Sequence, residues 1–348
     1  MTRLAAKGDQ FGTHRSLLPL GSLPQPAERL DNDFSRLFWG EMLLAVETLN
    51  IDAASFRQME EAIPRRPVED RILETVAARG KQHNPVTGSG GMLLGTVKEI
   101  AEGHPDKDRL PVGTRVASLV SLSLTPLRVD RIRAVRPASA QVDIEGEAIL
   151  FSSGAYAVLP KDLPERLALA VLDVAGAAPQ VARLVEPGQV VLILGAGGKS
   201  GLLCAQEARR ILGTNGLVIG VESFAIYAEE ARGLGLYDHV IEADARDPVA
   251  IRNAVLSRTA GREADVSFSC VNVADAEAAA LLSTRDRGKV YFFAMSTSFS
   301  KAALGAEGLG KDVDLLIGNG FAHGHADRSL QIMRDFPNLR ALFERRYG

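Results

Sequence analysis

The sequence predicts an α/β protein in which a β-rich unit precedes a doubly wound parallel sheet. Its 348 residues are enough for two domains of ordinary size. Apolar runs before residue 165 are short and broken by Gly and Pro, whereas strands and helices alternate after it. We therefore expect a β-rich domain over 1–165, completed by the C-terminal segment 323–348, and a doubly wound domain over 166–322.

The composition is typical of a globular protein, with 46% hydrophobic and 24% charged residues and a formal net charge of -3. Cys204 and Cys270 are the only cysteines, and their apolar surroundings predict buried free thiols. The N-terminus lacks the apolar segment of a signal peptide, and no run reaches the roughly 18 apolar residues of a membrane span. We therefore expect a cytoplasmic protein with neither nucleic acid nor membrane as a partner.

Short apolar runs between turn residues predict the strands of the first unit. Gly103–Asp108 and Pro111–Gly113 have the Gly and Pro content of turns. The expected strands are Met42–Leu49, Met92–Ile100, Arg115–Leu122 and Ala155–Leu159.

The second unit alternates strand and helix. Val190–Leu194 is a continuous apolar run, as in a parallel strand buried on both faces. Lys199–Leu212 has helical spacing of its apolar residues. Further strands are expected over Gly216–Glu222, His239–Ile241, Ala264–Val271, Lys289–Ala294 and Val313–Ile317, and further helices over Ala225–Leu234, Val249–Thr259, Ala274–Ser283 and, interrupted at Pro337, Asp327–Tyr347.

The turn between this first strand and helix, L-G-A-G-G-K-S-G over 194–201, has two interpretations. A phosphate-binding P-loop needs a glycine five residues before Gly198, and Ile193 stands there. A dinucleotide-binding turn needs glycines at the strand end, under the pyrophosphate and at the helix–strand contact. The sequence therefore favours a Rossmann-type domain, with these positions filled by Gly195, Gly197, Gly198 and Gly201.

The next strand ends in an acidic residue, Glu222, which bears on whether the expected cofactor is NAD or NADP. A carboxylate there can accept hydrogen bonds from both ribose hydroxyls and would repel a 2′-phosphate, which favours NAD, although Ser223 leaves room for NADP. The alternative is a solvated Glu222 at a plain strand end. Lys199 and Ser200 begin the helix whose backbone N–H groups would receive the pyrophosphate, and Lys199 either joins them or faces solvent.

Three further loops at the carboxyl edge of the sheet are expected to border the cofactor, with ordinary loop structure as the alternative. They are Val271-Asn272-Val273 on the ribose side, Met295-Ser296 near the nicotinamide amide, and Asn319 after the last strand.

The order of the two units resembles the medium-chain dehydrogenase/reductase superfamily, which implies a GroES-like fold for the first unit. In its zinc-using members, a cysteine and a Gly-His-Glu turn stand where this chain has Asn50 and Gly91, and a third ligand falls near Asp173. Zinc chemistry needs three protein ligands. We therefore expect no metal.

Longer strings indicate one smaller family. They are G-T-H-R at 12–15, L-P-Q-P-A at 23–27, V-E-T-L-N-I-D-A-A-S-F at 46–56, G-A-G-G-K-S-G at 195–201, F-F-A-M-S-T-S-F at 292–299, and I-G-N-G-F at 317–321 followed by Gly324-His325. They resemble the L-erythro-3,5-diaminohexanoate dehydrogenases of anaerobic lysine fermentation. The resemblance implies NAD-linked oxidative deamination of (3S,5S)-3,5-diaminohexanoate to 5-amino-3-oxohexanoate. Relatives of this architecture pair their cofactor domains, which implies a homodimer.

That reaction needs a base and an anionic environment for an iminium ion. Asp52 and Asp173 are the candidates, because each carboxylate lies in an apolar stretch and the metal ligands of zinc relatives would lie beside both. The alternative for Asp52 is an N-cap of the helix Ala53–Glu61, and Asp173 could likewise cap or bend a helix.

The substrate's carboxylate and second ammonium need counter-charges and polar contacts. The candidates are His14, Arg15, Glu47, Asn50 and Arg57. For the cations the alternative is a surface or fold-stabilising role, and for Glu47 it is an ion pair with a neighbouring cation.

Two other functions stay open. A zinc-free quinone or enoyl reductase would use NADPH, against which Glu222 argues. A dinucleotide-binding protein without turnover would not need the carboxylates Asp52 and Asp173.

Overall fold

The computed structural model describes residues 7–84, 88–294 and 296–348. The chain forms two compact units, Met1–Leu169 and Ala170–Arg346, with Tyr347 assigned to the first and Gly348 to the second. The boundary lies between Leu169 and Ala170, where the sequence suggested 165 and 166.

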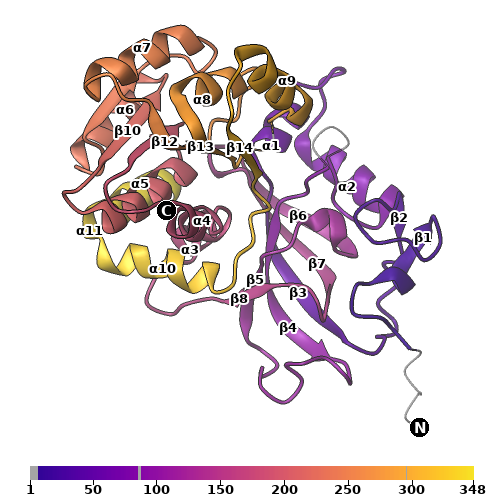
Figure 1. Ribbon diagram of the computed structural model, residues 1–348. Helices are drawn as coiled ribbons and strands as arrows, with labels where there is room; N and C mark the ends of the chain where they lie inside the picture. The colour runs from indigo at the N-terminus through magenta and orange to yellow at the C-terminus, as the bar shows by residue number, and fades with distance from the viewer. Residues whose placement is uncertain (1–6, 85–87, 295) are drawn as a thin grey trace. The chain divides into compact units, whose positions relative to one another are not determined.

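The first unit is built on a six-stranded antiparallel sheet (Figure 1). The four predicted strands are present, but two more follow each other at one edge of the sheet, and these were not predicted. Charged residues alternate with half-buried apolar ones along the first of them, and charged residues interrupt the apolar ones in the first half of the second, whose last four residues are all buried. In sheet order the strands are β6 (Leu127–Arg136), β7 (Gln141–Phe151), β3 (Glu41–Asn50), β4 (Met92–Ile100), β5 (Arg115–Ser118) and β8 (Tyr156–Val158).

The core of this unit lies between one face of the sheet and two helices, α1 (Ala53–Glu61) and α2 (Val68–Arg79). Phe56 of α1 and Ile72 of α2 are buried with the strand side chains. Burying a side chain of this size stabilises the fold by about 1.5–3 kcal/mol. The remaining elements are short: β1 (Ser16–Leu18) paired with β2 (Arg29–Leu30), and the 3-10 turns η1 (Thr13–Arg15), η2 (Leu122–Leu124) and η3 (Pro137–Ser139).

The second unit is the predicted doubly wound sheet, with all of its strand pairs parallel. Every residue of β9 is buried, as expected for a strand covered on both faces. The observed bounds of β9 and α5 match the predicted ones. Successive strands are added on one side of β9 as far as β11, and the chain then crosses to the other side of β9 for β12, β13 and β14. In sheet order the strands are β11 (His239–Glu242), β10 (Leu217–Glu222), β9 (Val190–Leu194), β12 (Ala264–Ser269), β13 (Thr284–Phe292) and β14 (Asp314–Ile317).

Helices connect these strands. One of them, α9 between β13 and β14, was not predicted. Its N-cap is Ser298, whose hydroxyl accepts a hydrogen bond from the Lys301 N–H. The helices of the crossovers are α5 (Lys199–Leu212), α6 (Ala225–Gly233), α7 (Pro248–Arg258), α8 (Glu277–Ser283) and α9 (Phe299–Leu309).

The C-terminal segment belongs to the second unit, so the expectation that 323–348 completes the first is wrong. Helix α10 (His325–Asp335) packs against α4 (Ala177–Leu184) and α5, and α11 (Pro337–Tyr347) follows it (Figure 1). The Ser329 hydroxyl donates to the Ala175 carbonyl at 2.8 Å. Leu330 and Met333 bury one side of α10, which gives the helix an apolar face that needs cover.

Two helices precede β9, α3 (Glu165–Leu172) and α4 (Ala177–Leu184). Among the residues described, no single helix has the length and apolar character to cross a membrane. By length and composition alone, α3 and α4 taken together would pass, with a bend of 46° between them. Core helices of soluble proteins have the same properties, and six of the eight residues of α3 are buried.

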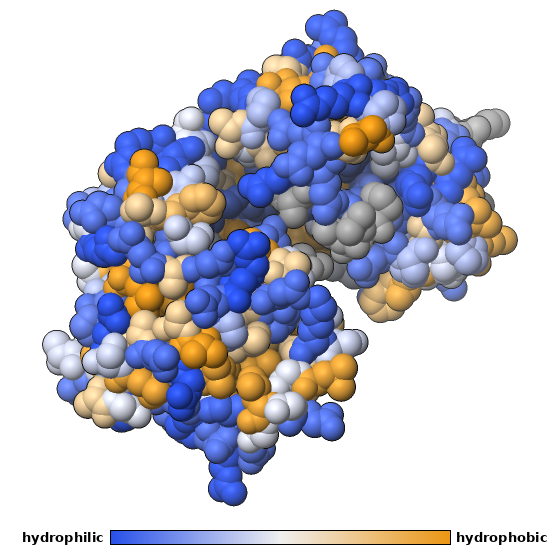
Figure 2. All heavy atoms as spheres, turned by 90° about the horizontal axis from the view of Figure 1, so that it is seen from above, coloured by the Kyte–Doolittle hydropathy of each residue, from blue (hydrophilic) through white to orange (hydrophobic). Residues whose placement is uncertain are grey.

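Hydrophilic side chains cover much of the face shown in Figure 2, with hydrophobic ones interspersed. Single exposed apolar side chains such as Leu20 and Ile63 are ordinary surface features. The apolar residues that hold each unit together lie inside that unit, in a core of buried side chains of its own.

Candidate functional site

The glycine turn after β9 has the geometry of a pyrophosphate cradle. Gly195 has φ +81°, a left-handed conformation that favours glycine. Gly201 lies so close to the turn that a Cβ on it would be 2.1 Å from the Gly195 carbonyl oxygen. The helix α5 therefore packs against the end of β9 only because residue 201 has no side chain, as its predicted role requires. Gly198 is the N-cap of α5, so the helix start faces the turn with its first N–H groups.

Glu222 at the end of β10 is held against this turn. Its Oε2 accepts a hydrogen bond from the Gly197 N–H at 3.0 Å, and its Oε1 accepts from the N–H groups of Ser223 and Phe224 at 2.9 and 3.2 Å. The residue is 7% exposed, which contradicts the solvated alternative. Each carboxylate oxygen has two lone pairs, so Oε2 retains acceptor capacity for a hydroxyl group.

The turn is also held by residues that the sequence did not single out. The Tyr237 hydroxyl is within hydrogen-bond distance of the carbonyl oxygens of Ala196 and Gly201, at 2.8 and 3.0 Å. Arg346 donates to the Gly197 carbonyl at 2.6 Å. Tyr237 lies 41 residues from Ala196 in the sequence, and Arg346 lies 149 residues from Gly197. No rule of sequence spacing connects residues so far apart.

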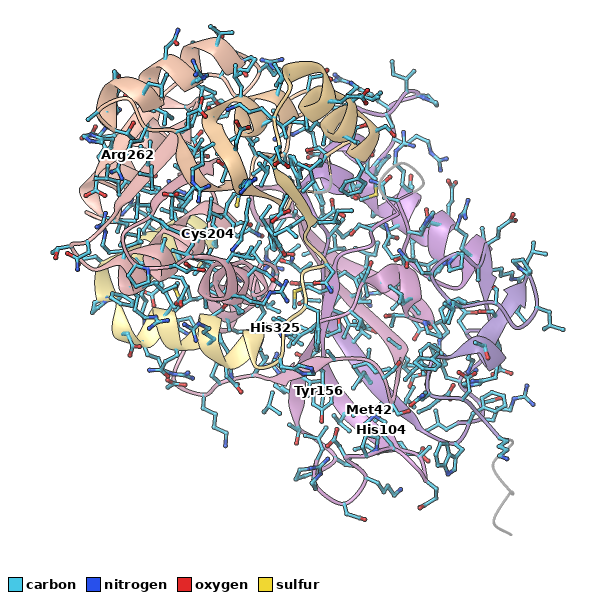
Figure 3. The ribbon with its side chains drawn as sticks, in the orientation of Figure 1. Met42, His104, Tyr156, Cys204, Arg262 and His325 are labelled. Carbon is cyan, nitrogen blue, oxygen red and sulfur yellow. The ribbon has the colours of Figure 1, made fainter. Side chains whose placement is uncertain are left out.

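The two cysteines lie close together, Cys204 on α5 and Cys270 directly after β12. Their sulfur atoms are 3.9 Å apart and both thiols are free, as expected, although only Cys204, labelled in Figure 3, is buried. Hydrogen bonding with Cys270 and burial raise the pKa of the Cys204 thiol. The Cys204 thiol is therefore expected to stay protonated and to act as packing.

Asp173 and Lys199, predicted for different roles, form an ion pair. Asp173 follows the end of α3, and Lys199 is the first residue of α5, directly after the glycine turn. Lys199 therefore does not simply face solvent, because its ammonium pairs with Asp173. Asp173 does not cap α4, because Gly176 is the N-cap of that helix. The contact brings the candidate base next to the expected pyrophosphate position.

Asp52 is the N-cap of α1, as the alternative interpretation held. Its Oδ1 accepts from the Ser55 N–H at 2.8 Å and its Oδ2 from the Ser55 hydroxyl at 2.5 Å. The side-chain amide of Asn84 in turn donates to the Ser55 hydroxyl at 2.6 Å. Capping does not consume every lone pair of the carboxylate, so a catalytic role for Asp52 stays a prediction.

His14 and Arg15 take the fold-stabilising role, and the predicted substrate contact of Arg15 is wrong. Arg15 is 0% exposed, and all five of its N–H groups donate within the protein, two of them to Glu41 at 2.8 Å. The His14 Nε2 is 2.8 Å from Glu41 Oε1, and its Nδ1 accepts from the Asp9 N–H. Burial opposes ionisation of Glu41, but hydrogen bonds from Arg15 and His14 outweigh it and lower the pKa of the carboxyl.

The positions of the missing zinc ligands are adjacent. Asn50 ends β3, is 3% exposed, and accepts a hydrogen bond from the Gln141 side chain at 3.2 Å. A Cβ on Gly91 would overlap the Asn50 carbonyl, and its φ is +82°. A histidine at 91 would therefore require the backbone to move. Within residues 7–84, 88–294 and 296–348, no three His, Cys, Asp or Glu side chains gather as a metal site.

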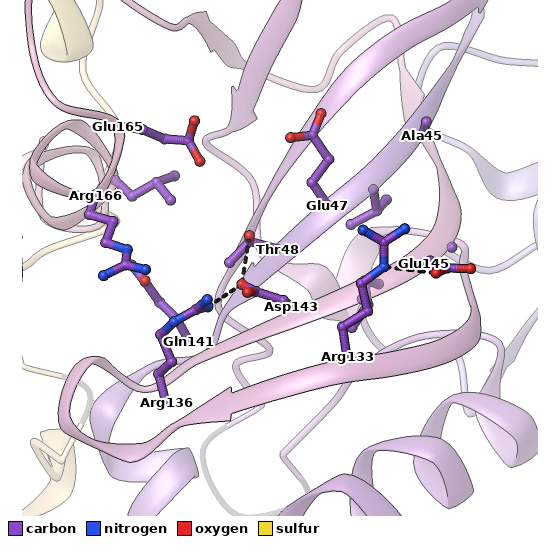
Figure 4. A pocket seen from close by; sticks show the side chains of 14 residues that line it. Ala45, Glu47, Thr48, Arg133, Arg136, Gln141, Asp143, Glu145, Glu165 and Arg166 are labelled. Carbon is purple, nitrogen blue, oxygen red and sulfur yellow. Dashed lines mark hydrogen bonds and ion pairs between the residues drawn. The ribbon is translucent and has the colours of Figure 1, made fainter.

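A charged hollow of about 570 Å³ lies against β3, β6, β7 and the start of α3 (Figure 4). Glu47 lines it, accepting from Thr96 at 2.6 Å and from Arg115 at 2.5 Å, so it has the neighbouring cation foreseen as its alternative. Arg115 also pairs with Glu165. The remaining charged lining residues are Arg133, Arg136, Asp143, Glu145 and Arg166.

Both signs of charge face this hollow. Asp143 pairs with Arg136 and accepts from the Thr48 hydroxyl at 3.2 Å, and Glu145 accepts from Arg133 at 2.8 Å (Figure 4). Such a lining suits a small molecule that carries both ammonium and carboxylate groups. Arg57, by contrast, is exposed on α1 and is not among the residues of the hollow.

Two of the three predicted cofactor loops at the carboxyl edge of the parallel sheet are in contact with each other. The Ser296 hydroxyl donates to the Val273 carbonyl at 3.3 Å, which joins the loops after β12 and β13. The Asn319 side chain accepts from the Phe321 N–H at 3.1 Å, a loop-stabilising contact. Val271 and Asn272 follow β12 as expected, and Met295 lies outside the described residues. Contacts of these residues with a cofactor stay predictions.

Comparison with known proteins finds similarity to one family of dehydrogenases over nearly the full length of the chain. A family model for the L-erythro-3,5-diaminohexanoate dehydrogenase N-terminal domain matches residues 14–160. The L-erythro-3,5-diaminohexanoate dehydrogenases of Acetoanaerobium sticklandii and Fusobacterium nucleatum subsp. nucleatum are 50% and 49% identical over 343 residues, which cover 98% of this chain and 99% of each relative.

Solved structures support the fold. The CurK enoyl reductase has a TM-score of 0.55 at 17% identity, and the Escherichia coli quinone oxidoreductase in complex with NADPH has 0.52 at 16%. Each match covers 86% of this chain and 80% of the other. At such identities the likeness concerns the fold alone, and it confirms the Rossmann-type sheet with a GroES-like unit.

Proposed function

Because the chain belongs to the L-erythro-3,5-diaminohexanoate dehydrogenase family, we propose that it catalyses oxidative deamination of the 3-amino group of (3S,5S)-3,5-diaminohexanoate. The carrying observation is similarity over nearly the full length of two enzymes of that name. The diamino acid, water and the oxidised cofactor give 5-amino-3-oxohexanoate, ammonium, a proton and the reduced cofactor. The quinone and enoyl reductase alternative has only a likeness of fold in its support.

The glycine turn fits a nicotinamide dinucleotide, since Gly201 lets α5 begin close against the end of β9, so that the first N–H groups of the helix face the turn. A nicotinamide bound there would supply the acceptor for the hydride from C3 of the substrate. Glu222 favours NAD over NADP, because its buried carboxylate is fixed where the adenosine ribose is expected and would repel a 2′-phosphate.

The chain's own residues supply the proton chemistry. We assign Asp173 as the carboxylate that takes protons from the substrate ammonium and from the attacking water, held by its ion pair with Lys199. An anionic group also stabilises the iminium ion formed on the substrate. Asp52 is the second candidate, with its carboxylate oriented by Ser55.

We further propose that this chemistry uses no metal. The amide of Asn50 and the bare backbone of Gly91 replace two ligands of zinc-using relatives, and neither is a good zinc ligand. Zinc found at about one per chain by elemental analysis of the active enzyme would contradict the metal-free mechanism.

We propose that the substrate's other charged groups bind in the hollow of the first unit. The charges around Glu47 and Arg166 suit the second ammonium and the carboxylate of the diamino acid.

The reaction is tested by following NADH absorbance at alkaline pH with the diamino acid, simple alcohols and β-amino acids as substrates. We expect reduction of the cofactor with 3,5-diaminohexanoate as substrate, faster with NAD than with NADP. Activity on alcohols alone would contradict the assignment. NADH binding without any turnover would instead support a dinucleotide-binding protein.

The proposal extends to the protein's setting. We propose an enzyme of lysine fermentation, as the family resemblance implies, that is cytoplasmic and forms a homodimer through its cofactor domains, as relatives of the two-domain architecture do. Light scattering after size exclusion measures the mass directly, and a mass near the 37.2 kDa of one chain would contradict the dimer.

A further inference from the structure

We propose that Arg346, two residues from the C-terminus, is a positioning residue that holds the pyrophosphate turn in its cofactor-binding conformation. The inference rests on the proposed binding of a nicotinamide dinucleotide. It concerns the second unit alone, since α11, α6 and the turn all belong to it.

The guanidinium of Arg346 connects three elements. Its Nη1 donates to the Gly197 carbonyl at 2.6 Å. Its Nε donates to Glu230 on α6 at 2.9 Å, and its Nη2 also pairs with Glu230. Its Cζ lies 4.5 Å from the ring centroid of Tyr227, also on α6. The side chain is 11% exposed, so these contacts form where water competes weakly.

Gly197 is thereby held on both sides. Its N–H donates to Glu222, its carbonyl accepts from Arg346, and a Cβ on it would lie 2.6 Å from the Cβ of Tyr227. A trans peptide is planar, so fixing the Gly197 carbonyl also fixes the Gly198 N–H, which donates to Gly195 at 3.2 Å. The orientation of the turn before α5 therefore depends on a residue of α11.

The role is one of geometry rather than of charge. Glu230 pairs with the guanidinium, and hydrogen bonds from Arg346 and Arg345 lower the pKa of this carboxyl against the opposing effect of burial. An ion-paired cation adds little net attraction for phosphate. A planar fork, however, binds a carboxylate and a carbonyl in one fixed geometry, whereas the rotatable donors of a lysine ammonium on its flexible stem do not fix that geometry.

Arg345 provides a matched control. It pairs with the same Glu230 at 2.5 Å, but its side chain is 62% exposed and no contact with Gly197 is among its hydrogen bonds in the described structure. Arg345→Gln removes one cation from the same helix and the same carboxylate. It leaves the hydrogen bond to the turn in place.

The experiment compares full-length wild type, Arg346→Gln, Arg346→Lys and Arg345→Gln. NADH affinity is measured by fluorescence titration, and kcat and the two KM values by the amine assay. We expect both Arg346 variants to raise the NADH Kd and the KM for NAD about tenfold, equal to about 1.4 kcal/mol. The kcat and the KM for the diamino acid should stay within about twofold, as should every constant of Arg345→Gln.

Thermal unfolding of each variant separates turn geometry from stability. If Arg346→Gln is unfolded at the assay temperature, Arg346→Lys carries the test, because it keeps the ion pair. Wild-type NADH affinity in the folded Arg346 variants would overturn the inference, as would equal weakening by Arg345→Gln or full rescue by lysine. A wild-type chain that does not bind NADH would overturn the proposed function as well, which makes the two failures distinguishable.

Discussion

Gly201→Ala is the most direct test of the glycine turn. A Cβ at this position would lie 2.1 Å from the Gly195 carbonyl oxygen, about 1 Å short of the 3.0 Å below which Cβ contacts essentially do not occur. The nearest atoms are all backbone, so no side chain can rotate away. The start of α5 must therefore move away from β9, against the hydrogen bond between the Tyr237 hydroxyl and the Gly201 carbonyl.

Two opposing terms set the magnitude. Replacing a glycine inside a helix by alanine favours the helix by about 1 kcal/mol. Forcing an extra carbon into a closely packed site costs about 1–3 kcal/mol, and more where backbone must move. We expect the second term to win here, with the free energy of unfolding reduced by about 1–2 kcal/mol and the NADH Kd raised by about tenfold or more.

Gly308→Ala in α9 is the matched control, because a Cβ there meets nothing within 4 Å. It should raise the free energy of unfolding by up to about 1 kcal/mol and leave NADH affinity unchanged. The assays are denaturant unfolding and fluorescence titration of NADH. Wild-type affinity in Gly201→Ala, together with stability equal to or above wild type, would refute the account of the turn.

Three further predictions address cofactor choice, catalysis and pH. Glu222→Gln removes the repelling charge, so the ratio of kcat/KM for NADP over NAD should rise; an unchanged ratio would show that Glu222 does not select the cofactor. Asp173→Asn should lower kcat by about 100-fold or more while NADH still binds, whereas wild-type kcat would leave Asp52 as the candidate base. Burial, together with the nearby charge of Arg79, lowers the pKa of Lys81 from 10.5 to about 8, and the ammonium donates to the Pro24 and Gln25 carbonyls. Between these two values the unfolded chain binds more protons, so the free energy of unfolding should rise as pH increases across that window, and Lys81→Met should remove the rise.

The elements of the parallel sheet followed from local pattern. The run V-V-L-I-L and the helical spacing after it carry their structure in neighbouring residues, and the observed bounds of β9 and α5 agree with the predicted ones. The glycine turn followed for the same reason, because strand, turn and helix are contiguous. By contrast, charged residues interrupt the apolar ones along β6 and the first half of β7, and no strand was predicted for either segment.

The roles of single charged residues depended on partners far along the chain. Arg15 was a candidate for the substrate, but Glu41 lies 26 residues away and meets it in the interior. Asp52 was ambiguous between capping and catalysis, and the cap is local, since Ser55 is three residues on. For Asp52 the partner is near in the sequence, and the capping role could be predicted as one of two alternatives. For Arg15 the partner is distant, and the sequence could not decide between a substrate contact and a fold-stabilising role.

The sequence by itself determined the two-unit organisation, the parallel sheet, the glycine turn and the family, because each depends on contiguous patterns or on matching strings. Only the tertiary structure joined Asp173 to Lys199, set Glu222 on the Gly197 N–H and brought Arg346 to the carbonyl of the same glycine. These contacts span 26, 25 and 149 residues. Such contacts arise from the packing of helices on a sheet, which local periodicity does not encode.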